Sequence, residues 1–163
     1  MAARPRFIAD AMLGSLATWL RILGFDTLYF RRIDDNELIR ISKQDDRILL
    51  TRDSGITGSR KARSAYFVNS EETFSQVCEV AAGFNLRHYI DTGQSRCPRC
   101  NGRLESIPPE AAAGAVPDHV LRQGLAFARC GECGKVYWEG THKRRIDRVV
   151  EAVRNDQEAR RNH

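Results

Sequence analysis

The sequence lacks the long hydrophobic runs that membrane segments need. Its 163 residues contain no uninterrupted apolar stretch of the roughly 18–20 residues that a membrane helix requires. The basic N-terminus leads into a segment that Asp10, Ser15 and Thr18 interrupt, so it lacks the apolar core of a signal peptide. We therefore expect a cytoplasmic protein without a membrane partner, in which disulfides rarely persist.

Histidine is scarce, and its positions give little support to a histidine-based mechanism. The 4 histidines all lie at position 88 or later, after the acidic residues discussed below. No Ser/His/Asp set is evident, and no glycine-rich Walker loop is present to hold a nucleotide phosphate. The sequence therefore predicts no nucleotide cofactor.

The composition is that of a globular protein, long enough for one ordinary domain or for a small domain with a mini-domain. Charged residues make up 29% of the chain, and the net charge is +5 with a pI near 9.2. This excess is mild and spread along the chain, so it permits a polyanionic partner without requiring one.

Apolar strand patterns alternate with helical patterns over the first ninety residues. We expect strands at 6–9, 26–30, 47–51 and 65–69. Helical spacing follows the first strand until Gly24, a second helix is expected over 34–44, and a third over 70–84 with Ser70 as its N-cap. Such alternation predicts an α/β fold whose central parallel sheet is covered by helices on both faces.

The chain changes character at about 90–95, where this alternation stops and cysteine becomes frequent. Cys97 and Cys100 form one CxxC pair, Cys130 and Cys133 form another, and 29 residues separate the pairs. Two such turns create a tetrahedral thiolate site, the preferred coordination of structural zinc. Disulfides and redox-active CxxC motifs are the alternatives. Disulfides are disfavoured in the cytoplasm, and a redox pair is expected at a helix N-terminus in the first region. The lone Cys78 is expected to be a core residue.

Acidic residues follow the predicted strands at the edge of the sheet where ligands bind. Asp10 and Asp53 come at or near the ends of two apolar strands, and Asp35 begins the helix after another. Three neighbouring carboxylates repel one another unless cations lie between them, and such oxygen-rich sites suit Mg²⁺ or Mn²⁺. Asp34 and Glu37, taken singly, are expected to be helix caps.

Three further residues near Asp53 are candidates for substrate binding. The Thr51 hydroxyl is expected to orient a metal ligand, and the Arg52 guanidinium to hold a phosphate. Lys61 lies in the basic stretch 59–63, which we expect to follow the nucleic-acid backbone along the same edge. The alternatives are a surface ion pair between Arg52 and Asp53 and a solvated basic stretch.

The segments "FIADAMLGSLATWLRILGFDTLYF", "DDNELIRIS", "RILLTRD", "CPRCNGRL" and "CGECGKVYWEGTHKRR" occur in an order and spacing that resemble the Mut-seven C-terminal RNase family. The resemblance implies a PIN-like three-layer α/β sandwich over residues 1–92 and a small zinc ribbon over 93–145. A charged tail over 146–163 completes the chain, and we expect it to be helical and then frayed. One departure is Thr18, where the family often has arginine.

The resemblance also implies an activity. It predicts a metal-dependent endoribonuclease in which Asp10, Asp35 and Asp53 are catalytic and bind Mg²⁺ or Mn²⁺. The four ribbon cysteines bind the structural zinc, and RNA, for example a tRNA or an mRNA, is the expected partner. PIN-like nucleases often have a fourth acid, for which Asp34 and Glu37 are the nearest candidates. The oligomeric state is left open.

The ribbon is expected to help grip RNA through charge and base stacking. The residues that this interpretation uses are Arg99, Arg103, Tyr137, Trp138 and the stretch 142–145. As an alternative, the two aromatic residues pack a ribbon too small for a core of its own.

Two other functions compete with the nuclease. A catalytically silent module on the same fold would bind RNA or protein. A phosphoacceptor receiver domain also has acids after its first and third strands, but it needs a fifth strand and a lysine beyond it, neither of which is evident.

Overall fold

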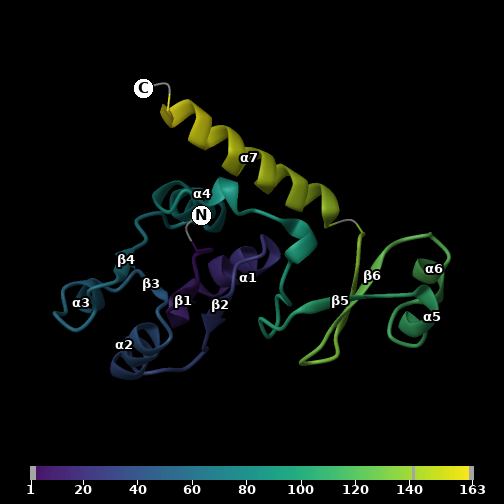
Figure 1. Cartoon of the computed structure of the whole chain (residues 1–163), viewed down its shortest axis with the longest axis horizontal. Coiled ribbons are helices and arrows are strands. Elements are labelled where there is room, and N and C mark those ends of the chain that lie inside the picture. The colour runs from purple at the N-terminus through teal and green to yellow at the C-terminus, as the bar shows by residue number, and fades with distance from the viewer. Residues whose placement is uncertain (1–2, 141, 162–163) are drawn as a thin grey trace.

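Four short parallel strands form the central sheet in the computed structural model (Figure 1). The structure describes residues 3–140 and 142–161, with side chains as far as 155. The strands are β1 (Phe7–Ala9), β2 (Thr27–Tyr29), β3 (Ile48–Thr51) and β4 (Ala65–Phe67), in the spatial order β2-β1-β3-β4. Each neighbouring pair is parallel, so the predicted strands and their parallel arrangement are confirmed.

Alternate residues of the inner strands face opposite sides of the sheet and enter two separate apolar cores. Phe7 and Leu50 belong to the larger core, with α1 (Gly14–Ile22) and α4 (Thr73–Gly83). Ile8 and Leu49 belong to the other core, with α2 (Asp35–Gln44) and the short α3 (Ser54–Thr57). Helices therefore cover both faces of the sheet, as the sequence pattern predicts.

Two of the expected helix ends are correct and one is wrong. Gly24 follows α1 with a φ of 93°, a left-handed conformation that glycine adopts without strain. Asp34 caps α2 by accepting a hydrogen bond from the Glu37 N–H. Ser70 does not cap α4, which begins at Thr73 after Glu72, and its N–H donates to the Glu79 carboxylate.

Residues after η2 (Leu86–His88) and η3 (Thr92–Gln94) build the second region around a three-stranded antiparallel sheet. Its strands are β5 (Leu104–Ile107), β6 (Phe127–Cys130) and β7 (Val136–Trp138), in that order. The helices α5 (Pro109–Ala112) and α6 (Asp118–Leu121) lie between β5 and β6, and Val120 and Phe127 help form a small apolar core. The ribbon therefore has a small apolar core of its own, and the Tyr137 hydroxyl contacts the Cys97 sulfur.

The C-terminal helix α7 (Lys143–Arg161) packs on the first region (Figure 1). Val149 and Val153 are buried in the larger core beside the sheet, so α7 covers α4 from outside. The described backbone is helical to Arg161, which exceeds the short helix predicted from 146, and residues 162–163 lie outside the described residues. Within the described ranges, no helix combines the length and the apolar character that crossing a membrane demands.

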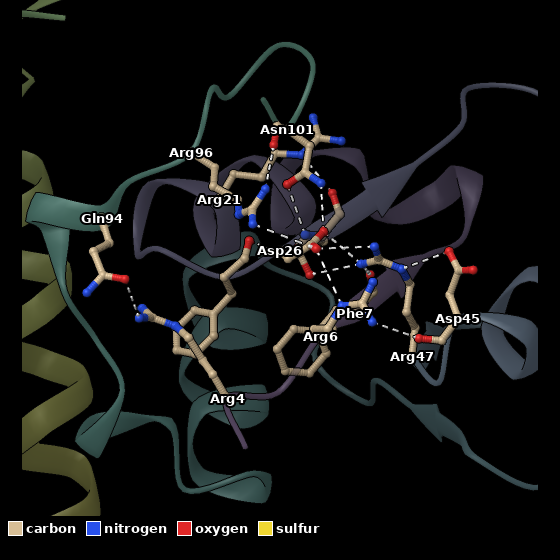
Figure 2. A network of polar contacts seen from close by, with 12 residues as sticks. Arg4, Arg6, Phe7, Arg21, Asp26, Asp45, Arg47, Gln94, Arg96 and Asn101 are labelled. Atoms are coloured by element: carbon tan, nitrogen blue, oxygen red, sulfur yellow. Dashed lines mark hydrogen bonds and ion pairs between the residues drawn. The ribbon is translucent and has the colours of Figure 1, made fainter. Parts of the chain in front are cut away.

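The Asp26 carboxylate, directly before β2, holds the two regions together (Figure 2). Arg47 donates to both of its oxygens, at 2.7 and 3.2 Å, and the Asn101 amide of the ribbon donates to it at 2.8 Å. Burial by itself raises the pKa of Asp26, but the bonds from Arg47 and Asn101 and the charges of Arg47 and Arg96 lower it to about 2.

The ribbon also covers the open edge of β2. The Asn101 side-chain oxygen accepts the Thr27 N–H at 3.0 Å, and the Arg21 guanidinium donates both to the Thr27 carbonyl and to the Pro98 carbonyl at 2.9 Å. Thr27 is fully buried by these contacts. Edge strands expose unpaired backbone groups, and here Asn101 of the ribbon pairs the Thr27 N–H while Arg21 of α1 pairs the Thr27 carbonyl.

We expect Val153→Ala to lower the free energy of unfolding by about 1.5–3 kcal/mol, because it removes buried apolar atoms from the core beneath α7. Urea denaturation followed by circular dichroism measures this change. Glu151→Ala, on an exposed position of the same helix, is the control and should change stability little. Equal stabilities for the two variants would show that α7 is not part of the core.

Stability should fall in acid through Asp26. Its folded pKa of about 2 lies below the model-peptide value of 3.8, so its contribution is complete above about pH 4 and is lost as the pH falls toward 2. Allowing for screening by water, we expect Asp26→Asn to cost about 1–2 kcal/mol at pH 7, and less at lower pH. Urea titrations from pH 7 to pH 3 measure the difference. The exposed Asp147→Asn serves as control, and a difference that does not vary with pH would contradict the assignment.

Candidate functional site

Acidic residues from three segments lie at the carboxyl edge of the parallel sheet. Asp10 directly follows β1, Asp53 follows the adjacent β3, and Asp35 begins α2 after β2, the other neighbour of β1. Because parallel strands all end at the same edge, residues far apart in the sequence emerge side by side there. The topology therefore brings the three predicted acids to one edge.

Asp10 is the buried member of this group, with 6% of its surface exposed. Its Oδ2 accepts the Thr51 hydroxyl and the Arg52 N–H, the latter at 3.3 Å, and its Oδ1 accepts the Met12 N–H at 2.9 Å. The Thr51 hydroxyl oxygen in turn accepts the Asp53 N–H at 3.0 Å. Thr51 thus orients the Asp10 carboxylate and connects it to the backbone of Asp53.

The other acids at this edge are exposed and differ in their bonding. Asp53 accepts the Gly55 N–H at 2.8 Å with one oxygen, and Asp35 lies in the first turn of α2. Asp34 is the cap of α2, and Glu37 forms an ion pair with Arg40. The capping expectation is confirmed for Asp34, whereas Glu37 lies in the first turn of α2 without capping it.

The three carboxylates suit a hard divalent cation in their chemistry, since all are oxygen donors at one edge and Asp10 is held in a fixed orientation. They are less closely grouped than the thiols of the ribbon. Among the residues that the structure describes, the four ribbon cysteines form the group of at least three ligands close enough together to hold a metal ion.

The structure places Arg52 in a structural contact. Its Nη1 donates to the carbonyls of Val68, Asn69 and Ser70, at 2.8, 2.8 and 2.9 Å. These carbonyls follow β4, so Arg52 fastens the end of β3 to the end of β4. The guanidinium is neither paired with Asp53 nor free to hold a phosphate with all of its nitrogens.

Lys61 lies in the connection that returns from α3 to the amino end of β4, where the next residue, Ala62, is buried. Its side chain is exposed, and it stands four residues before the start of β4. Of the predicted site residues in the first region, Lys61 is thus the one that the topology places away from the carboxyl edge.

Sequence reasoning missed exposed residues beside Asp10. Met12, two residues after Asp10, is 72% exposed, and Phe30, directly after β2, is 38% exposed. Arg31 and Arg32, both exposed, continue the same loop toward Asp35. An aromatic residue with two arginines at the end of a strand is the signal that could have identified this surface, because bases stack on aromatic rings and phosphates attract guanidinium groups.

The four ribbon cysteines converge as predicted. The Cys97 and Cys133 sulfurs are 3.7 Å apart, the Cys100 and Cys130 sulfurs are 3.4 Å apart, and all four lie within 4.8 Å of one another. None is bridged by a disulfide. A tetrahedral zinc with bonds of about 2.3 Å needs sulfurs roughly 3.8 Å apart, so the geometry fits zinc with no open coordination position.

Neighbouring groups prepare these thiols differently for metal binding. Burial raises the pKa of Cys97, but the Tyr137 hydroxyl, 3.0 Å from its sulfur, and backbone amides of the turn outweigh burial and lower the pKa to about 7. Burial and the neighbouring thiols raise the pKa of Cys100 to about 12. Because zinc binds thiolates, Cys97 is more ready than Cys100 to accept it at neutral pH.

A family model described as the Mut7-C RNAse domain matches residues 5–150, nearly the whole chain. The match includes the three edge acids and all four ribbon cysteines. No curated protein and no solved structure matches the chain.

We expect the protein to bind one zinc ion, and Cys97→Ser to lose it. A serine hydroxyl is a poor zinc ligand compared with a thiolate. Because Cys97 is buried, water cannot easily take the place of the lost sulfur. Native mass spectrometry measures the zinc content, and thermal melts measure the loss of stability. Cys78→Ser is the control, since Cys78 lies on α4, outside the thiolate group, and should retain the metal. Full zinc occupancy in Cys97→Ser would contradict the assignment.

Proposed function

This chain belongs to the Mut7-C RNase domain family, and we propose that it is a metal-dependent endoribonuclease of the cytoplasm. Membership supports a nuclease, that is, a hydrolase that acts on RNA. The proposal adds Mg²⁺ or Mn²⁺ dependence, cleavage within the RNA chain, and a PIN-like relationship of the α/β domain over residues 1–92. Residues 93–145 then form the zinc ribbon, and 146–163 form the tail.

The observation that supports this proposal most is the placement of Asp10. A buried carboxylate costs free energy unless charge or hydrogen bonds compensate it. Here both oxygens accept hydrogen bonds, and exposed Asp35 and Asp53 emerge from neighbouring segments of the same edge. One of these bonds makes Asp10 the N-cap of the short 3-10 helix η1 (Ala11–Leu13), and together they hold its carboxylate in a fixed orientation beside the exposed acids, as a shared metal site would need.

Asp10, Asp35 and Asp53 would hold the divalent cation. When bound, such an ion activates water and stabilises the leaving oxygen in phosphodiester hydrolysis, which would give a 5′-phosphate and a 3′-hydroxyl. Thr51 keeps the Asp10 carboxylate in place by its hydroxyl bond. Arg52 keeps the ends of β3 and β4 together, so that the edge keeps its shape while substrate binds.

The exposed loop after β2 would bind the RNA strand next to these acids. Phe30 offers a ring for base stacking, and Arg31 and Arg32 offer charge for the phosphates. In the ribbon, Trp138 is 40% exposed and remains a candidate for stacking, whereas the Tyr137 hydroxyl is engaged with Cys97. Exposed Arg99 and residues 142–145 add positive charge there.

A catalytically silent RNA- or protein-binding module is the second candidate. It is favoured by the looser grouping of the three carboxylates compared with the ribbon thiols. Both candidates bind RNA through the same surface and differ in whether the edge acids bring about cleavage.

We expect Asp53→Asn and Asp10→Asn each to lower the rate of RNA cleavage at least about 100-fold, because each removes a charged ligand of the divalent cation. Cleavage of a fluorescent single-stranded RNA, with Mg²⁺ or Mn²⁺ added, measures the rate. Asp53 is exposed, so its variant should fold normally.

Asp46→Asn is the matched control. It makes the same change of charge at the amino end of β3, and asparagine tolerates the φ of 51° at this position. A wild-type protein that binds RNA but does not cleave it with either metal would support the silent module instead.

A further inference from the structure

A basic cavity of about 510 Å³ lies where the first region meets the ribbon. Arg4 and Arg6 line it from the segment before β1, Asp26 from the segment before β2, and Arg96 and Arg103 from the ribbon. It is thus at the amino end of the sheet, whereas the edge acids are at the carboxyl end. Figure 2 shows Arg6 and Arg96 directed toward the Asp26 carboxylate, whereas Arg4 is directed toward Gln94.

The positive charge of the cavity exceeds its negative charge. Four arginines line it against the single carboxylate of Asp26. That carboxylate already accepts a bidentate contact from Arg47, which lies behind the cavity, and an ion pair from Arg6 at 3.4 Å. Arg96 is 3.8 Å from the same carboxylate. Asp26 therefore cannot neutralise Arg4 and Arg103 as well.

Among the described residues, no carboxylate forms an ion pair with Arg4, although the negative charge of Asp91 partly offsets its positive charge. Its guanidinium lies 5.0 Å from the centre of the Phe25 ring, and its Nη1 donates to Gln94 at 3.3 Å. Its Nε and Nη2 are shielded from water and have no hydrogen-bond partner in the described part of the chain. A Cβ at Gly24 would be 2.6 Å from Nη2, so the glycine provides the space for this group. A charge that water solvates so poorly gains strongly from an anion nearby.

Arg103 faces the cavity from the ribbon side. Its side chain is exposed, and within the described part of the chain its guanidinium has no hydrogen-bond or ion-pair partner. An exposed cation on the ribbon side and a largely shielded cation opposite it suit an anionic ligand that enters from solvent.

We propose that this cavity binds a phosphate group of an RNA strand, at a site separate from the carboxyl-edge acids. Guanidinium groups match phosphate oxygens in geometry, and a cavity of this volume accommodates a nucleotide rather than a bare ion. The identification of RNA as the source of the phosphate rests on the proposed function, whereas the phosphate chemistry rests on the cavity alone.

Arg103→Gln tests the site, because it removes the charge at the mouth without removing an intramolecular bond. Binding of a fluorescent single-stranded RNA is measured by anisotropy without added Mg²⁺ or Mn²⁺, so that cleavage does not interfere. We expect the affinity to fall about fivefold to tenfold. The slope of log K against log salt should decrease by about 0.7, the value for one phosphate contact on a single strand. Arg122→Gln is the matched control, an equally exposed arginine on the ribbon away from the cavity, and should change neither quantity.

The source of the phosphate is tested with uridine 5′-monophosphate and inorganic phosphate. The proposal is supported if these small phosphates displace RNA from the wild-type protein and displace it less well from Arg103→Gln. In the contrary result, the small phosphates raise the melting temperature of the wild type but not of Arg103→Gln, while both proteins bind RNA equally well. That result would overturn RNA as the ligand. No effect of the variant on either ligand would overturn the site altogether. Cleavage assays separate this outcome from the proposed function, since a wild type that cleaves RNA keeps the nuclease even if the cavity binds nothing.

Discussion

The candidate site depends on the parallel pairing of β1 with both β2 and β3. Each strand ends in the same direction, so the residues that follow them meet at one edge although they are widely separated in the sequence. Asp10 is the centre of this arrangement, because β1 lies between the strands that lead to Asp35 and Asp53. An antiparallel β3 would carry Asp53 to the far edge, and no arrangement of side chains could then restore the group.

The second constraint is the Asp26 carboxylate at the opposite edge. It connects β2 to the start of β3 through Arg47, and through Asn101 to the turn that presents Cys97 and Cys100 to a metal. Folding of the ribbon and order at the edge of the sheet therefore stabilise each other. The surplus of guanidinium groups around this carboxylate also creates the basic cavity, so one contact network both joins the two regions and provides positive charge for a polyanion.

Local patterns predicted what is determined locally. The strands, the end of α1 at Gly24 and the thiolate group follow from apolar periodicity, a left-handed turn and paired CxxC spacing. Contacts between distant segments were not predictable in this way. Arg52 binds the carbonyls after β4, and the Glu79 carboxylate accepts the N–H groups of Asn69 and Ser70. The burial of Val153 likewise depends on packing against α4, and the sequence of the tail does not show which element its apolar face contacts.

The most direct test of the account is where a divalent cation binds on the zinc-loaded protein. Mn²⁺ added to the ¹⁵N-labelled protein broadens the amide signals of residues near it. The account predicts selective broadening at Asp10, Asp35 and Asp53 and in the residues next to them, with the amides around Asp26 unaffected. Broadening confined to other surfaces, or none at millimolar Mn²⁺, would contradict a shared metal site at the carboxyl edge.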